Sequence, residues 1–425
     1  MSRTTAAAAA GERARASGGG DELPLSADGR AWTAPRIARW VAAAWTALLL
    51  LGMVALWLPG ATIRGNELSI ERAVFTAVNA ATLTGFQQAV PLDQLGALGQ
   101  AVVLALVVVG TLSTLLIGGL ALNRAIRLPY TDLQIVRATL FTYVFSLGIG
   151  TSLLLDPTRG LIAAASQAAS AFGNSGLFLG TLPAITDWRT HAALMPLAVV
   201  GAMSVPLLLE VSDLLFRRQA LSPHARVTIA LLAGVYLFGL IVLAPWGLRG
   251  ANGGLNLSGA LATGSALSID GRTAGLPLHA PAAMTRAAQW LLIALMLIGA
   301  APGGTAGGVK VTALFHAWRG TRRALRREAG LRVTGIAATW ILGYALLVFA
   351  TVLGLLATLP EMAADRLLML AASSVSNTGL SHEPVTLTGG GLAVLTAAMA
   401  LGRAAPLLVL WWLASTTEDA DVAVG

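Results

Sequence analysis

Four short segments of the chain each place a small residue before a glycine and an apolar residue after it. Backbone carbonyl groups from four such loops can replace the water around a monovalent cation without introducing a full charge. Glycine suits the narrowest level because it accepts positive φ and carries no Cβ that would block the axis. The segments therefore predict a cation filter. Its candidate residues are Thr82, Leu83, Thr84, Gly85, Asn174, Ser175, Gly176, Thr273, Ala274, Gly275, Asn377, Thr378 and Gly379.

Each of these glycines alone is more often a turn residue or a helix-packing residue. The four motifs, however, recur about every 90 to 105 residues, which indicates one unit repeated four times. An ordered set of four favours a filter over four unrelated turns.

A second feature interrupts the long apolar stretch 284–316. Residues 299–308 contain five glycines and a proline, which a continuous helix does not favour. The sequence therefore predicts a break, with a kink for helix packing as the alternative. Arg403 lies halfway along the last apolar stretch, where an unpaired charge costs several kcal/mol. We expect it to face a water-filled path or to pair with a carboxylate such as Glu210.

Other polar residues have simpler expected roles. Lys310 is predicted close to the cytoplasmic end of its span, where its ammonium group can reach the interface, so anchoring comes before gating. Arg272 follows Asp270 by two residues, and we expect a local ion pair that braces the third loop. The five histidines show no metal-ligand spacing. The predicted metal site is the filter alone, for a monovalent cation.

Composition places most of the chain in lipid. Of its 425 residues 56% are hydrophobic and 11% charged, with a mean hydropathy of +0.74. The absence of cysteine excludes disulfides and thiolate chemistry. The net charge of +8 is scattered between apolar stretches, without the single basic face that nucleic-acid binding uses, so no nucleic-acid partner is expected.

The apolar stretches predict an all-α polytopic membrane protein. Eight are long enough to span a bilayer: about 40–61, 95–122, 133–155, 191–216, 226–247, 284–316, 332–358 and 390–414. Four shorter apolar segments, which end at the glycines, lie between the first and second span of each successive pair. Such re-entrant segments are tolerated only where they face protein or a water-filled cavity. We therefore predict four tandem helix–pore-loop–helix repeats, with eight spanning helices and four re-entrant pore helices, in a pseudo-fourfold arrangement around one pore.

The repeats are predicted at 39–124, 125–220, 221–330 and 331–415, with a disordered cytoplasmic tail at 1–38 and a second tail at 416–425. Most of the 28 basic residues fall in the first tail and between repeats, and the positive-inside rule places these on the cytoplasmic side. The long first tail does not have the layout of a signal peptide. The expected location is the plasma (inner) membrane, with both termini cytoplasmic.

These motifs resemble the Trk/Ktr/HKT superfamily of cation transporters, most closely the bacterial Ktr and Trk membrane subunits, over about residues 40–415. The resemblance rests on the filter segments 171–177 and 272–276, the glycine-rich segment 299–310 and residues 402–407. The chain departs from the family at Gly299-Ala300-Ala301-Pro302, where relatives often have Gly-Gly-Ser-Pro.

The resemblance implies potassium uptake, no enzymatic activity and no organic cofactor. Some plant relatives have serine at the first filter glycine and favour sodium, so Gly85 indicates K⁺ as the transported ion, with Na⁺ as the alternative. The broken segment would lie under the filter as a gate, and Arg403 would form an electrostatic barrier. The candidate gate residues are Gly299, Pro302, Gly303, Gly304, Thr305, Gly307, Gly308 and Arg403.

The resemblance also implies a homodimer that works with a soluble RCK-type nucleotide-binding regulatory subunit, of the kind found in Ktr and Trk systems. The basic segment 319–332 is a candidate docking surface. The alternatives are the pore subunit of a P-type potassium ATPase, or a relative that is permeable to Na⁺ or coupled to Na⁺ or H⁺. An unrelated secondary transporter would show two inverted halves, whereas the four units here share one orientation.

Overall fold

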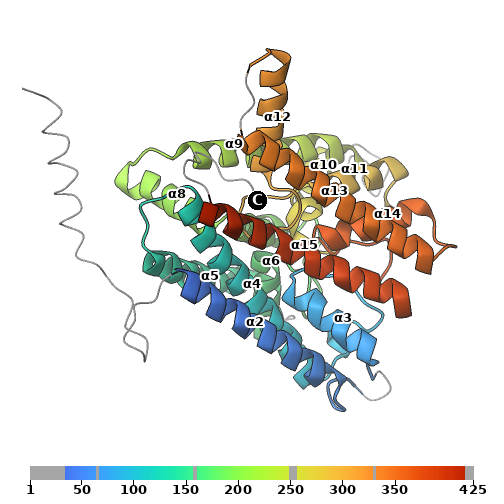
Figure 1. Ribbon diagram of the computed structural model, residues 1–425. Coiled ribbons are helices and arrows are strands. Elements are labelled where there is room, and N and C mark those ends of the chain that lie inside the picture. The colour runs from blue at the N-terminus through green and yellow to red at the C-terminus, as the bar shows by residue number, and fades with distance from the viewer. Residues whose placement is uncertain (1–33, 64–66, 157–159, 248–255, 329–331, 417–425) are drawn as a thin grey trace, which may run out of the picture.

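The computed structural model describes residues 34–63, 67–156, 160–247, 256–328 and 332–416 (Figure 1). In these residues the chain is helical, and its paired extended backbone consists of three isolated bridges. The predicted first tail lies outside the described residues up to position 33, and its last residues belong to the first described helix. Most of the predicted second tail also lies outside them.

The helices follow the chain in four groups. The first group is α2 (Ala34–Trp57), α3 (Ile70–Ala81), η1 (Leu92–Gln94) and α4 (Ala97–Ala125). The second is α5 (Asp132–Leu154), α6 (Gly160–Gly173), the π-turn η2 (Thr190–Leu194), α7 (Met195–Ala202) and α8 (Val205–Arg217). The third is α9 (Pro223–Leu243), η3 (Ala244–Gly247), α10 (Leu257–Ile269), the π-turn η4 (Asp270–Ala274), η5 (Pro281–Ala283), α11 (Arg286–Leu297) and α12 (Val311–Leu325). The fourth is α13 (Arg332–Thr358), α14 (Ala364–Val375) and α15 (Gly389–Thr416).

In each group one short helix of 12 to 14 residues precedes the predicted filter glycine, namely α3, α6, α10 or α14. Such a helix covers too little distance to cross a bilayer. Two of them begin at side-chain caps, where Ser69 accepts from the Arg72 amide and Asn256 from the Gly259 amide. Other helices surround the short ones: α2, α4 and α15 contact α3, while α11, α13 and α15 contact α14. The short helices are therefore held inside the bundle, as re-entrant pore helices require.

Among the described residues six helices are long and apolar enough to cross a membrane: α2, α4, α5, α9 with η3, α13 and α15. The other two predicted stretches are not continuous helices. The stretch 191–216 bends by 109° between α7 and α8, where Pro206 stands in the first turn of α8 and cannot donate to the preceding turn. The stretch 284–316 is broken between α11 and α12, where the glycines and Pro302 predicted a break.

The outer faces of the long helices are apolar. On α5, for example, Phe141, Val144, Phe145 and Ile149 are all exposed, which suits contact with lipid rather than water. Inside the bundle, small residues let backbones approach. A Cβ at Gly110 of α4 would lie 2.5 Å from the carbonyl oxygen of Ala81. The long helix α4 thus packs directly against the end of the pore helix α3.

Candidate functional site

All four short helices end within a few residues of the predicted filter glycines. After α3, α6 and α14 the chain turns at a residue with positive φ, which is Leu83 (56°), Asn174 (53°) or Asn377 (50°). This conformation costs a leucine about 1 to 2 kcal/mol. Equivalent backbone bonds hold all three turns, from Thr84 to Asn79, from Ser175 to Ser170 and from Thr378 to Ser373. The four segments therefore leave their helices as irregular loops.

The four glycines lie in one closed ring, and all have positive φ: Gly85 (88°), Gly176 (66°), Gly275 (60°) and Gly379 (81°). A Cβ on each would strike the backbone of the following repeat. It would lie 1.9 Å from the Ser175 oxygen at Gly85, 2.5 Å from the Gly275 oxygen at Gly176, 1.8 Å from the Thr378 oxygen at Gly275 and 2.0 Å from the Thr84 oxygen at Gly379. Carbonyl oxygens from all four predicted filter segments therefore converge, and only glycine leaves them room.

A buried side chain braces the first loop. The Oδ1 atom of Asn79 accepts from the amides of Gly85 (2.8 Å) and Phe86 (3.0 Å), and its Nδ2 donates to the Phe86 carbonyl (2.9 Å). Asn79 is fully buried, so these bonds satisfy groups that water cannot reach. Thr82 and Thr84 share a further hydroxyl–hydroxyl bond of 2.7 Å.

The third loop is built differently and is shifted by one residue. The turn η4 extends its pore helix, and the bond that Thr84 makes in the first loop is made by Gly275 itself, to the Asp270 carbonyl at 3.3 Å. The carboxylate of Asp270 accepts from the Leu276 amide at 2.6 Å, where Asn79 accepts from Gly85. The Gly275 oxygen accordingly takes the place in the ring that the Thr84 oxygen has in the first loop. The side chain of Thr273 lies outside what the structure describes.

The predicted pair between Arg272 and Asp270 does not form. Among the described residues Arg272 donates to the Gly299 carbonyl at 3.4 Å, and Asp270 accepts from Leu276. The carboxylate of Asp270, at the start of the π-turn, faces the loop amide and not the guanidinium of Arg272. Arg272 therefore joins the third filter segment to the glycine-rich segment below it.

The glycine-rich segment 298–310 forms a loop under the filter that is buried from Gly299 onward. Its two ends are paired, since Gly299 donates to the Val309 carbonyl at 2.9 Å and Val309 donates to the Leu297 carbonyl at 3.0 Å. Its tip touches three other segments of the bundle. A Cβ would lie 2.7 Å from the Gly118 oxygen at Gly303, 2.1 Å from the Ala202 oxygen at Gly304 and 1.8 Å from the Ser376 oxygen at Gly307. The structure thus brings all the predicted loop residues together beneath the filter; Pro302 and Gly308 are buried in the same loop.

Arg403 of α15 lies between this loop and the first filter segment and is 7% exposed. Its guanidinium donates to the carbonyls of Thr82 at 2.7 Å, Leu83 at 3.4 Å and Thr305. The negative end of the α3 dipole adds to this attraction. The alternative partner Glu210 is excluded, because its carboxylate accepts from the amide and hydroxyl of Ser222.

Lys310 does not reach the interface, so the predicted anchoring role is wrong. Its side chain is 4% exposed and its ammonium group donates to the Ala306 carbonyl, inside the loop. It lines a narrow cavity together with Arg403, Gly303 and Gly307. The cavity has a volume of about 10 Å³, which is too small to hold a hydrated ion. The fold of the loop, rather than the length of the span, decides where this charge lies.

Three structural features were not predicted from the sequence. The first is the bend at Met203, whose available signal was Pro206. The second joins the filter to the loop below: Asn174 Nδ2 donates to Thr305 Oγ1 at 2.8 Å. The third closes the ring on its outer side, where Arg72 donates to the Val385 (2.8 Å) and Leu387 (2.6 Å) carbonyls. No local pattern reveals bonds between residues hundreds of positions apart.

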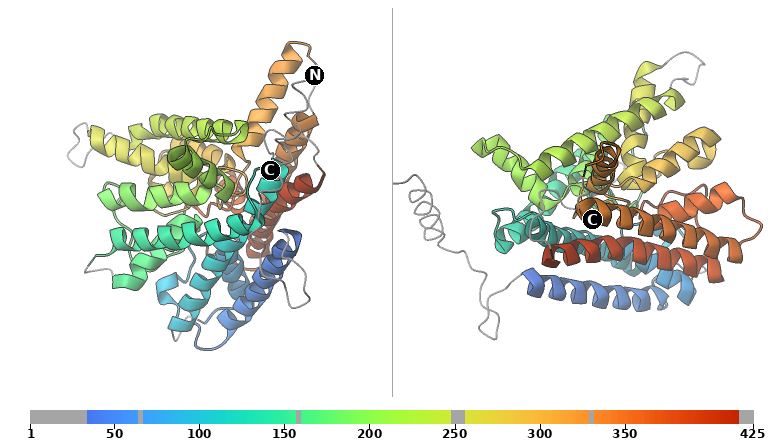
Figure 2. Two further views of the ribbon diagram at one scale, coloured as in Figure 1. Left: turned by 90° about the vertical axis from the view of Figure 1, so that its left-hand side faces the viewer. Right: turned by 45° about the horizontal axis from the view of Figure 1, so that its top comes forward.

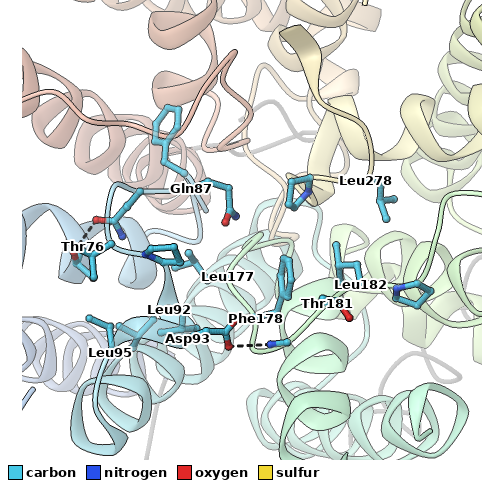
Figure 3. A pocket seen from close by; sticks show the side chains of 18 of the residues that line it. Thr76, Gln87, Leu92, Asp93, Leu95, Leu177, Phe178, Thr181, Leu182 and Leu278 are labelled. Carbon is cyan, nitrogen blue, oxygen red and sulfur yellow. Dashed lines mark hydrogen bonds between the residues drawn. The ribbon is translucent and has the colours of Figure 1, made fainter. Parts of the chain in front are cut away.

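Outside the ring lies a cavity of about 430 Å³ between the first and second repeats (Figure 3). Its wall includes Asp93, whose carboxylate accepts from the Gly180 amide at 3.0 Å, and Gln87. Elsewhere in the outer loops, partial burial lowers the pKa of His382, and the positive charge of Arg366 lowers it further.

The fold and the site together define a multi-pass membrane protein with four re-entrant loops around a common axis and a broken helix beneath them. No protein-family model matches the chain. Two proteins of Bacillus subtilis (strain 168) are similar over 87% of it: Ktr system potassium uptake protein D at 24% identity, with 92% of its own length covered, and protein B at 23%, with 91% covered.

A solved structure is also similar, that of the potassium transporter TrkH from Vibrio parahaemolyticus. It has a TM-score of 0.70 at 18% identity and covers 90% of this chain and 85% of its own. The chain is a homologue of the Ktr proteins and has the TrkH fold. The resemblance to the Trk/Ktr superfamily is thereby confirmed.

Proposed function

We propose that this protein takes up potassium across the plasma membrane through the ring of four loops. The ring of converging carbonyls at Gly85, Gly176, Gly275 and Gly379 carries this proposal. Oxygen atoms from four repeats can replace the hydration shell of a monovalent cation. The relatives named for potassium uptake supply the identity of the ion.

The buried loop 298–310 is the gate of this path, and Arg403 is its electrostatic barrier. Arg403 fastens the loop to the first filter segment through Thr305 and Thr82. A positive charge at this place repels a cation that leaves the filter. The cavity beside it has a volume of only about 10 Å³, which supports a path that is closed at this level.

The pore loops enter from the outer side, and both termini are cytoplasmic. The distribution of basic residues supports this orientation. Helix α12 and the residues after it carry Arg319, Arg322 and Arg323, on a segment that projects from the bundle (Figures 1 and 2). We assign this segment to the docking of a soluble RCK-type regulatory subunit, on a homodimer of the membrane chain.

Uptake of a rubidium tracer tests the function. Cells that lack their own potassium uptake systems should grow at low potassium and accumulate rubidium when they express the chain. Liposomes that contain the purified protein should also accumulate rubidium, and without ATP. A requirement for an ATPase partner would instead support the pore subunit of a P-type ATPase. Equal uptake of Na⁺, or flux that needs a Na⁺ or H⁺ gradient, would support the permeable or coupled alternative.

A further inference from the structure

The side chain of Gln87 contacts the filter itself. Its Nε2 atom donates to the Gly176 carbonyl at 3.0 Å and to the Gly85 carbonyl at 3.4 Å. A carbonyl oxygen can only accept, so the amide nitrogen must face it. We propose that Gln87 is a positioning residue that fixes the outermost carbonyls of the first two loops and sets the cation preference of that level. This inference rests on the proposed function.

The other repeats have no such donor. The positions that correspond to Gln87 are Phe178, Ser381 and, because the third loop is shifted by one residue, Leu278 rather than Pro277. Phenylalanine, leucine and proline carry no side-chain donor, and the Ser381 hydroxyl donates to the Glu383 carbonyl at 2.7 Å. Among the described residues at this position, Gln87 therefore breaks the fourfold pattern. Its effect falls on one side of the ring, where the first and second repeats meet.

The surroundings hold Gln87 in place. Its carbonyl accepts from the Val385 amide at 2.7 Å, so its backbone is fastened to the fourth repeat. Arg72 in turn holds the carbonyl of Val385. The side chain reaches from this anchored point across to the second repeat, along the cavity shown in Figure 3. Gln87 thus connects three repeats over the mouth of the ring.

A bound amide changes what a carbonyl can do for an ion. The hydrogen bond occupies one of the two lone pairs of the oxygen and restrains its direction. A restrained ring cannot close around a smaller cation as readily as a free one. Loss of the bond should therefore lower the preference for K⁺ over Na⁺. One neutral hydrogen bond corresponds to a change of roughly 2- to 10-fold.

The adjacent Gln88 provides a matched control. It stands on the same segment, but its Oε1 accepts from the Thr76 hydroxyl at 2.8 Å and does not contact the ring. We would reconstitute the full chain in liposomes and measure rubidium uptake and its competition by Na⁺. The substitution Gln87→Met keeps the shape and removes the donor. It should lower the preference for rubidium over Na⁺ 2- to 10-fold.

Gln88→Met should leave the preference unchanged. Gln87→Asn keeps an amide that is one methylene too short, and it should behave like Gln87→Met. An unaltered preference in both Gln87 variants would overturn the inference, as would an equal loss in the Gln87 and Gln88 variants. As a readout that does not need transport, K⁺ and Na⁺ can be compared for how much each raises the melting temperature.

If the wild-type protein takes up no rubidium, the proposed function fails. The difference between K⁺ and Na⁺ in the melting temperature then still tests Gln87. A difference that disappears in Gln87→Met and persists in Gln88→Met would support its role at the ring, and a difference that persists in both would refute it.

Discussion

The first and third filter loops serve the same ring but are held in different ways. A neutral amide, Asn79, braces the first loop through three bonds, whereas a carboxylate, Asp270, braces the third through one. The first loop is joined to the buried loop below by Arg403, which comes from the fourth repeat. The third is joined to it by its own Arg272. Equal geometry at the ring is thus reached from unequal supports.

The difference separates what a filter requires from what a gate requires. Four similar carbonyl positions are needed to surround an ion, and the register shift of the third loop preserves them. The proposed gate is a single loop, and it approaches Gly118, Ala202 and Ser376 of three different repeats. The side chains that support the loops can therefore differ between repeats, whereas the positions of the ring carbonyls cannot.

The largest effect is expected from a side chain inside the ring. Gly275→Ser would place Cβ 1.8 Å from the Thr378 oxygen, and Gly85→Ser 1.9 Å from the Ser175 oxygen. Both should lower the preference for K⁺ over Na⁺ at least tenfold, because the carbonyls must move apart. Competition of rubidium uptake by Na⁺ measures this. Gly343→Ala, in open space on α13, is the control. Unchanged selectivity in both serine variants would refute the filter.

The next effect concerns the support from Arg403. Arg403→Ala removes a positive charge from the path and frees the loop from the Thr82 and Thr305 carbonyls. Rubidium flux should rise several-fold. The melting temperature should fall, because a buried acceptor left without a partner costs about 1 to 3 kcal/mol. Flux should be measured on reconstituted protein, at equal amounts inserted. A variant that inserts normally but conducts less would contradict the barrier.

Asn79 makes more hydrogen bonds to its loop than Asp270 does, so its loss should destabilise the protein more. Asn79→Ala leaves three buried backbone groups unpaired, and Asp270→Ala leaves one. Asn79→Ala should therefore lower the melting temperature more, each lost partner costing roughly 1 to 3 kcal/mol. Ser373→Ala is the matched control, because this residue stands six positions before Gly379 and its buried hydroxyl has no partner among the described residues. Equal shifts in all three variants would show that the braces do not support the loops.

The smallest effect is expected where filter and gate touch through a neutral bond. Thr305→Val keeps the volume of the side chain but removes the acceptor for Asn174 and a longer bond of 3.4 Å to the Phe172 carbonyl. Flux should change about two- to fivefold with selectivity intact, since the shorter of these neutral bonds is worth about 1 kcal/mol. Thr312→Val, at a buried hydroxyl that has no partner in the described part of the chain, should leave flux unchanged. A shift in K⁺ over Na⁺ preference would instead assign Thr305 to the filter.

The sequence by itself determined the membrane class, the four repeats, the four loop positions and the break at 299–308. Apolar length, spacing and glycine content are local properties, and the bilayer allows few structures that satisfy them. Only the tertiary structure decided the partners of the buried charges. Lys310 donates to a carbonyl inside the loop, and Arg272 donates to the Gly299 carbonyl instead of pairing with Asp270. Arg403 donates to backbone carbonyls instead of pairing with Glu210. A buried charge takes whichever oxygen the packed backbone presents, and that depends on segments far away in the chain.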